Sequence, residues 1–160
     1  MQKLIFTLMF VSACCTGAVA DENPHLYSTG RIMEVDRCAS AWLIKRFADP
    51  QAEFAFFEDG QLITIGTAFD TPDARFSRTH SQSTFEVLMR HFNISDPKLK
   101  SLAAAIHEIE INYWAGAKDN PLASELEIKV KNIIRAKPEP EQCLEQCFRF
   151  FDQLMEKLPG

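Results

Sequence analysis

Three helix-start signals in the second half of the chain commit that half to helical structure. Ser83 lies three residues before Glu86, the spacing of a capping box, and apolar residues at helical spacing follow it. Asp96 and Asn120 are each followed by a proline. A capping residue followed by proline opens a helix, because the first turn has no use for the N–H that proline lacks. Each of these three positions therefore predicts the beginning of a helix.

The two helices that open with proline are predicted to run to about Trp114 and through Arg135. Pro138 and Pro140 then break the chain before a last helix. The apolar stripe of that last helix consists of Leu144, Phe148, Phe151, Leu154, Met155 and Leu158. Together with the helix that follows the capping box, the second half holds about four helices.

The first half has a mixed pattern. Arg31–Val35 and Glu53–Phe57 have the composition of short strands, and Leu62–Gly66 is the expected hairpin partner of the second. A helix over Arg37–Phe47 lies between the strands, with Asp36 as its N-cap. Strands gathered early and helices late predict an α+β fold, with a small early sheet or hairpin and one helix before the helical second half.

The chain opens with the three parts of a secretory signal peptide. Lys3 supplies the positive start, Leu4–Ala13 is an apolar run, and Ala18–Ala20 has the small residues of a cleavage site. The run is shorter than the about 20 residues that a membrane-spanning helix needs. We therefore expect a leader over residues 1–20, a single exported domain over residues 21–160, and no transmembrane segment in the mature chain.

A second cleavage site is also present in the leader. The residues before Cys14 resemble a lipoprotein box, and processing there would anchor Cys14 to a membrane. Release before Asp21 is the favoured outcome, because that site ends a leader of ordinary length. The expected location is the periplasm or the medium, with anchoring at Cys14 as the alternative.

Net charge and cysteine content limit the classes of function that this chain can have. The chain has a formal net charge of −5, which becomes −6 when the leader takes its one charged residue, Lys3, with it. This balance argues against nucleic-acid binding, which needs clustered lysine and arginine. Three cysteines remain after the leader: Cys38, Cys143 and Cys147. An odd number in an oxidising compartment leaves at least one thiol unpaired, or bound to another molecule or a metal.

Glu110 interrupts the apolar face of the helix that begins after Asp96. A carboxylate on a buried face needs a partner or must stay protonated. His107 lies three residues earlier on the same edge, and a histidine and a glutamate at this spacing can share a metal ion. The alternative is a salt bridge from Glu110 to an arginine such as Arg37 or Arg46, with His107 merely packed.

Cys38 lies in the first turn of the Asp36-capped helix. Free N–H groups at a helix start would lower the pKa of a thiol there, or would bind an oxyanion in its place. Asp36 competes for the same N–H groups, and a small buried thiol chosen for fit is the alternative. Arg37 and Lys45 could close over such an anion.

Four further side chains each have more than one interpretation. Arg46 could join Arg37 and Lys45 around an anion, or could pair with Asp49. His80 follows a polar loop and could reach a site, although a lone loop histidine is usually solvated. Cys143 and Cys147 are one helical turn apart, where packing is the first explanation and a mutual disulfide is poorly placed. A bridge from one of them to Cys38 fits better.

Several motifs together resemble the chromate resistance exported protein family, which is related to the C-terminal domain of ChrB-type chromate regulators. The match extends over about Arg31 to Trp114, with weaker similarity through the last helix. The matching pieces are Val35–Phe47, Asp49-Pro50, Ala52–Phe54, Phe69–Pro72, His80 with Ser83–Glu86, and Ile106–Asn112.

The resemblance implies a role in chromate resistance or response. The regulators carry a further N-terminal segment, so their DNA-linked role is not implied for this chain. Relatives fused to the regulator tend to have a cysteine where this chain has Ser83. That difference weakens any mechanism that needs a thiol at this position.

The leading hypothesis is an exported protein that binds or senses an oxyanion or a metal ion. Asp36, Arg37, Cys38, Lys45 and Arg46 are the candidate ligand-binding residues. The candidate metal ligands are His80, His107 and Glu110, and a metal ion is the one cofactor they suggest. One alternative is a thiol-dependent redox enzyme in which Cys38 acts with His80 or His107 as its base. Another is an interaction module that uses the last helix, with Cys143 or Cys147 in a disulfide or partner contact.

Overall fold

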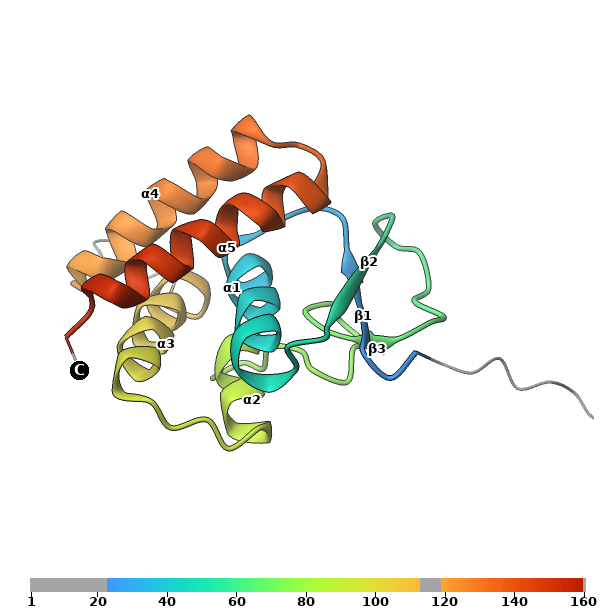
Figure 1. Ribbon diagram of the computed structural model, residues 1–160, viewed down its shortest axis with the longest axis horizontal. Coiled ribbons are helices and arrows are strands. Elements are labelled where there is room, and N and C mark those ends of the chain that lie inside the picture. The colour runs from blue at the N-terminus through green and yellow to red at the C-terminus, as the bar shows by residue number, and fades with distance from the viewer. Residues whose placement is uncertain (1–22, 113–118, 160) are drawn as a thin grey trace, which may run out of the picture.

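The computed structural model of the chain describes residues 23–112 and 119–159. The expected signal peptide, Cys14 and Trp114 lie outside these residues. A small parallel sheet comes first and a group of helices follows, so the predicted α+β class is confirmed (Figure 1). Among the described residues, no helix combines the length and the apolar character needed to cross a bilayer.

The sheet has three parallel strands in the order β2-β1-β3. Strand β1 (Leu26–Gly30) lies in the middle, between β2 (Glu53–Phe57) and β3 (Thr67–Ala68). The prediction for β2 is confirmed, but the strand predicted over Arg31–Val35 is wrong. Val35 instead begins the first helix, and the strand lies just before the predicted range.

Strand β1 was missed because its buried residues do not alternate with exposed ones. Tyr27, Ser28 and Thr29 are all buried. A central parallel strand is covered on both faces and therefore lacks the period-two pattern. The hydroxyl of Ser28 is satisfied within the fold, since its Oγ donates to the carbonyl oxygen of Ile65 at 2.7 Å.

The predicted hairpin over Leu62–Gly66 is also wrong. The turn that suggested it does form, because the N–H of Gln61 donates to the carbonyl of Glu58 at 2.9 Å. The chain then continues past β2, and Leu62 is 77% exposed. It forms β3 on the other side of β1, which leaves β2 with one strand neighbour.

Helix α1 (Val35–Leu43) connects β1 to β2 and forms the centre of the molecule. All nine of its residues are buried, and a wider π-helical turn continues it over Ile44–Ala48. The predicted helix therefore exists, but its N-cap is Glu34 and not Asp36. Asp36 is the second residue of α1, and its carboxylate accepts N–H groups of another helix.

Four helices surround α1: α2 (Thr84–His91), α3 (Pro97–Glu110), α4 (Pro121–Ala136) and α5 (Pro140–Lys157). Figure 1 shows α4 and α5 side by side across one side of α1, with α2 and α3 on the other. Ser83 and Glu86 form the predicted capping box. The side chains of Asp96 and Asn120 cap α3 and α4, as their sequence positions predict.

Candidate functional site

Three consecutive residues at the start of α1 connect it to three other parts of the fold. Asp36 contacts the beginning of α2, Arg37 contacts the loop after β3, and Cys38 contacts α5. Successive side chains on a helix are 100° apart, so three in a row point to different neighbours. The first turn of α1 is therefore where the elements of this domain meet.

Asp36 caps the helix after its own. Its carboxylate accepts the backbone N–H groups of Thr84 at 2.6 Å and Phe85 at 2.9 Å, and the hydroxyl of Ser40 at 3.2 Å. Burial raises the pKa of Asp36 well above its ordinary value, and the charges of Asp70 and Glu110 add to this rise. The two N–H donors act in the opposite direction by stabilising the carboxylate.

Arg37 forms a buried ion pair with Asp70. The Nε of Arg37 lies 3.1 Å from Oδ2 of Asp70, and its Nη2 donates to the carbonyl of Asp70 at 2.6 Å. Its Nη1 donates to the carbonyl of Ile32, and the hydroxyl of Thr84 donates to the other carboxylate oxygen of Asp70 at 2.7 Å. Gly30 makes room for this guanidinium, since a Cβ there would lie 3.2 Å from Nη1.

Each of the three cations expected to close over an anion is instead hydrogen-bonded to protein oxygens. Lys45 donates to the carbonyl of Ala52 at 2.8 Å. Arg46 donates through Nε and Nη2 to Asp152, at 2.9 and 2.8 Å. The structure distributes Arg37, Lys45 and Arg46 over three contacts and does not bring them around one shared space. Arg46 pairs with Asp152 and not with Asp49.

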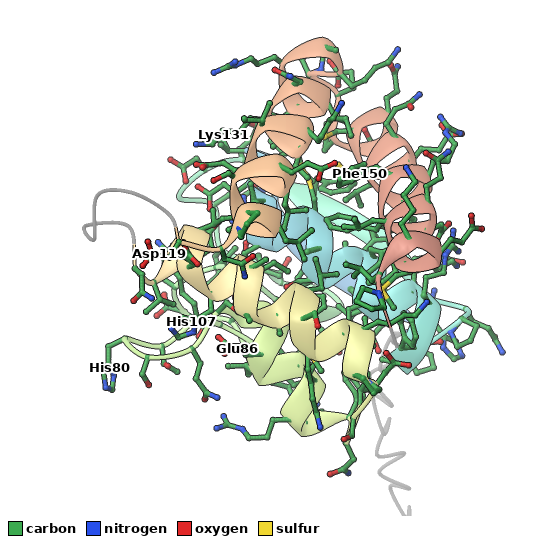
Figure 2. All side chains as sticks on the ribbon, turned by 90° about the vertical axis from the view of Figure 1, so that its left-hand side faces the viewer. His80, Glu86, His107, Asp119, Lys131 and Phe150 are labelled. Atoms are coloured by element: carbon green, nitrogen blue, oxygen red, sulfur yellow. The ribbon has the colours of Figure 1, made fainter. Side chains whose placement is uncertain are left out.

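His80, His107 and Glu110 also have separate surroundings. Figure 2 shows His80 on the loop before α2, while His107 lies with Glu86. Nδ1 of His107 lies 2.9 Å from Oε2 of Glu86, the same oxygen that accepts the N–H of the capping residue Ser83. Glu86 was recognised in the sequence only as part of a helix cap, although it also orients a histidine.

Glu110 is drawn into the protein, as its place on the apolar face predicts. Its side chain is 12% exposed and contacts Arg78 at 3.4 Å, at the edge of a cavity of about 600 Å³. Burial raises the pKa of Glu110, and Glu34 and Asp70 raise it further. The neighbouring positive charge of Arg78 and the N–H of Asp36 lower it in part.

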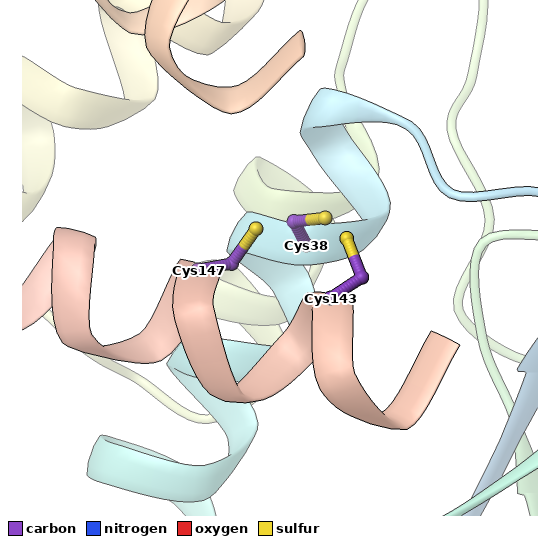
Figure 3. A group of neighbouring side chains, drawn as sticks. All are labelled: Cys38, Cys143 and Cys147. Carbon is purple, nitrogen blue, oxygen red and sulfur yellow. The ribbon is translucent and has the colours of Figure 1, made fainter. Parts of the chain in front are cut away.

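The three cysteines form a compact group between α1 and α5. Figure 3 shows the sulfur of Cys38 facing those of Cys143 and Cys147. All three sulfurs lie within 4.8 Å of one another, and each residue is 0% exposed. The cysteines are free thiols in this structure. Within residues 23–112 and 119–159, no other set of three His, Cys, Asp or Glu ligand atoms is this close.

Packing of α5 against α1 brings these thiols together. Cys143 and Cys147 are four residues apart, so they lie on one face of α5. Further along both helices, the rings of Trp42 and Phe151 are 5.3 Å apart, and Arg46 pairs with Asp152. The contacts advance together along α1 and α5, which therefore run in the same direction. This register places Cys38 opposite Cys143 and Cys147, in the first half of α5.

The three thiols differ in pKa. Hydrogen bonds from Cys147 and Cys38 lower the pKa of Cys143 to about 4. Hydrogen bonds with Cys143 and Cys147, together with burial, raise the pKa of Cys38. The hydrogen bond with Cys143, together with burial, raises the pKa of Cys147, and the bond with Cys38 lowers it in part. The expected low pKa at Cys38 is therefore wrong: its sulfur faces α5 and not the free N–H groups of its own helix. Of the three thiols, only Cys143 has a lowered pKa.

The comparisons with known proteins agree on one family. A family model described as ChrB, C-terminal domain, matches residues 27–158. Protein ChrB of Cupriavidus metallidurans is similar, with 37% identity over 87 residues, which are 53% of this chain and 27% of that protein. The chain thus matches little more than a quarter of this relative's length. No solved structure matches the chain.

Proposed function

The chain belongs to the ChrB C-terminal domain family, and from this premise we propose that it is an exported metal-ion-binding domain of a chromate-resistance system. Cys38, Cys143 and Cys147 are the ligands. The observation that carries this proposal is the position of their three sulfurs, all within 4.8 Å of one another. Thiolates are soft ligands and select soft ions, so the proposed ion is thiophilic.

Metal binding would make the α1–α5 contact responsive to the ion. Without an ion, the two helices are held at this end by weakly bonded thiols. Three metal–sulfur bonds would fix Cys38 to α5. Because Asp36 and Arg37 connect the same turn of α1 to α2 and to the loop after β3, tightening at Cys38 would reach both. A domain whose helix contacts tighten when an ion binds is suited to sensing that ion.

A titration of the reduced protein tests the site. The purified chain over residues 21–160 is titrated with Cd²⁺, and the sulfur-to-metal absorption band is followed. We expect one ion per chain and loss of at least tenfold in affinity in Cys38→Ser, Cys143→Ser and Cys147→Ser, because each removes one of three ligands.

Two further variants make the titration specific. Leu144→Val is the matched control, since it alters a buried residue beside Cys143 and leaves every thiol in place. It should bind as the parent does. His107→Ala distinguishes the thiol group from the sequence-predicted set of His80, His107 and Glu110. Loss of binding in His107→Ala with retention in the cysteine variants would move the site to that histidine and reject the thiol site.

A second candidate function follows from the thiolate at Cys143. A thiolate beside the thiol of Cys38 is suited to forming a disulfide with it, passing two electrons to an oxidant. Chromate is the oxidant that the family suggests. Reduction of two chromates to chromium(III) takes six electrons, which three disulfides supply, so the proposal predicts that the reduced protein loses three thiols per chromate consumed and that Cys143→Ser abolishes the reaction. No thiol loss on incubation with chromate removes this candidate.

Export is part of the proposal and rests on the N-terminal pattern of Lys3, Leu4–Ala13 and Ala18–Ala20. Cell fractionation and mass spectrometry of the full-length product test it. We expect a periplasmic or released chain that begins at Asp21. A chain that keeps residues 1–20 rejects export, and a lipid-modified Cys14 selects the anchored form.

A further inference from the structure

Three features of the cysteine group define the ion that it can hold: the number of ligands, the absence of water and the charge. The group offers three sulfurs, and no fourth His, Cys, Asp or Glu joins it within the described parts of the chain. Zinc and similar ions in protein sites take four ligands in a tetrahedron. A site with three sulfurs favours an ion that is complete with three bonds.

Water is a poor substitute for the missing fourth ligand. Cys38, Cys143 and Cys147 are each 0% exposed, so their sulfurs face a part of the core that solvent does not reach. Trivalent arsenic and antimony form three bonds in a trigonal pyramid, and a lone pair of electrons occupies the fourth direction. Such an ion needs no water ligand.

The net charge of the complex between an ion and three thiolates distinguishes the candidate ions further. The residues that shift the pKa values of the three thiols are the thiols themselves, and no lysine, arginine or histidine is among them. A divalent ion with three thiolates leaves one uncompensated negative charge in this interior, which is costly. A trivalent ion with three thiolates is neutral.

Resting on the proposed function, we propose that the cysteine group is a site for trivalent arsenic or antimony, bound as a neutral pyramidal complex with the sulfurs of Cys38, Cys143 and Cys147. Chromium(III), the reduced product of chromate, is a hard ion that prefers oxygen ligands and does not suit three sulfurs. The group therefore has a different specificity from the one that the family's resistance phenotype suggests.

The binding reaction balances without any change of oxidation state. Arsenous acid, As(OH)₃, meets three thiols; each As–O bond breaks and one As–S bond forms. Each hydroxyl leaves as water with one thiol proton, which gives As(S-Cys)₃ and three waters. Cd²⁺ binding to the same thiols gives an anionic complex and liberates protons from those thiols to the solvent.

Proton counting is therefore the sharpest test. Cd²⁺ liberates three protons more per ion than arsenous acid does. This difference is the same whether Cys143 begins as a thiol or a thiolate, because both reactions start from the same protein. Each proton of difference changes the ratio of the two affinities by about tenfold per pH unit. Parallel calorimetric titrations with arsenite and CdCl₂, in two buffers of different ionisation enthalpy, measure the count directly.

The expected result is one arsenite per chain, bound more tightly than Cd²⁺ at pH 6 and with three fewer protons liberated. Cys38→Ser, Cys143→Ser and Cys147→Ser should each reduce arsenite affinity by at least tenfold, and Leu144→Val should not. Circular dichroism of each variant shows whether it is folded, and Cys→Ala replaces Cys→Ser where it is not.

The outcomes distinguish this inference from the function on which it rests. Binding of Cd²⁺ with weaker or no binding of arsenite overturns the inference and leaves a thiophilic site in place. Retention of arsenite in one of the single cysteine variants shows a two-sulfur site and overturns the three-sulfur complex. Failure of both ions to bind the folded, reduced protein rejects the proposed function and the inference together.

Discussion

At the residue scale, Asp36 has two opposing influences. It is 1% exposed, and desolvation disfavours its charge, but two N–H groups at the start of α2 favour it. The balance is a raised pKa. Arg37 beside it forms an ion pair with Asp70. The burial of these two adjacent ionisable residues is therefore compensated in different ways, by N–H donors at Asp36 and by an ion pair at Arg37.

Asp36 makes the stability of the domain depend on pH. Its folded pKa lies above its ordinary value of 3.8, so the native state holds the proton more tightly than the unfolded state does. Its contribution is therefore complete below 3.8 and is lost as the pH rises through the folded pKa. We expect the parent minus Asp36→Asn difference in unfolding free energy to fall with rising pH, as measured by urea denaturation at a series of pH values.

Asp152→Asn is the control with the opposite sign. The hydrogen bond from Arg46 lowers the pKa of Asp152, so its contribution is present above 3.8 and is lost as the pH falls through the folded pKa. A difference that rises with pH for Asp36→Asn, or the same slope for both variants, would contradict the raised pKa.

At the scale of elements, two residues, Ser83 and Asp36, cap the start of α2. Ser83 closes the capping box with Glu86, and the carboxylate of Asp36 receives the next two N–H groups of the helix. Glu86 also contacts His107 on α3. The start of this helix therefore connects α1, α2 and α3, and a capping residue has a structural importance beyond its own turn.

Removal of the Ser83 hydroxyl should destabilise the domain. It leaves the N–H of Glu86 without its acceptor, and loss of a serine N-cap costs about 1 kcal/mol. Urea denaturation of Ser83→Ala measures the loss. Ser101→Ala is the matched control, because that serine is exposed on α3, and its effect should stay within about 0.5 kcal/mol. Equal losses in both variants would contradict the capping argument.

The α1–α5 contact depends on Phe151. Its ring is 0% exposed and lies 5.3 Å from that of Trp42, so Phe151→Ala leaves a cavity between the helices. Such a change in a core costs about 3–5 kcal/mol. Phe150→Ala on the same helix should cost less, because Phe150 is only partly buried. A larger loss in Phe150→Ala, measured by urea denaturation, would show that the helix register is different.

At the scale of the whole molecule, α1 is a buried helix that contacts several elements at its start and α5 along its length. Its first turn holds α2, the loop after β3 and α5, and its far end is held by Asp152. An ion at the cysteine group would strengthen the one contact that has no strong bond of its own. Binding and global stability should therefore be coupled.

Saturation with the ion should raise the stability of the entire domain. A ligand present at 100 times its Kd raises the unfolding free energy by about 2.7 kcal/mol when it binds only the native state. We expect this shift in urea denaturation of the reduced protein with Cd²⁺ or arsenite. Cys38→Ser should show no shift. An equal shift in that variant would mean that the ion stabilises the protein from another place.

The sequence by itself determined the features that act within one helical turn. The caps at Ser83, Asp96 and Asn120 and the four later helices were all predicted, because a cap satisfies N–H groups two or three residues away. The buried position of Glu110 followed from helical periodicity in the same way. Strand β1 was missed because burial on both faces of a central strand removes the pattern.

Tertiary structure alone decided how the candidate residues are grouped. The sequence left Cys38 open between a reactive and a packed thiol, gave packing as the first explanation for Cys143 and Cys147, and suggested a bridge from one of these two to Cys38. It did not predict that all three sulfurs meet. Their meeting depends on the register of α5 on α1, which the packing of Trp42 against Phe151 fixes about one helical turn beyond Cys38 and Cys147. Contacts between distant elements leave no local pattern, because they depend on how whole surfaces fit.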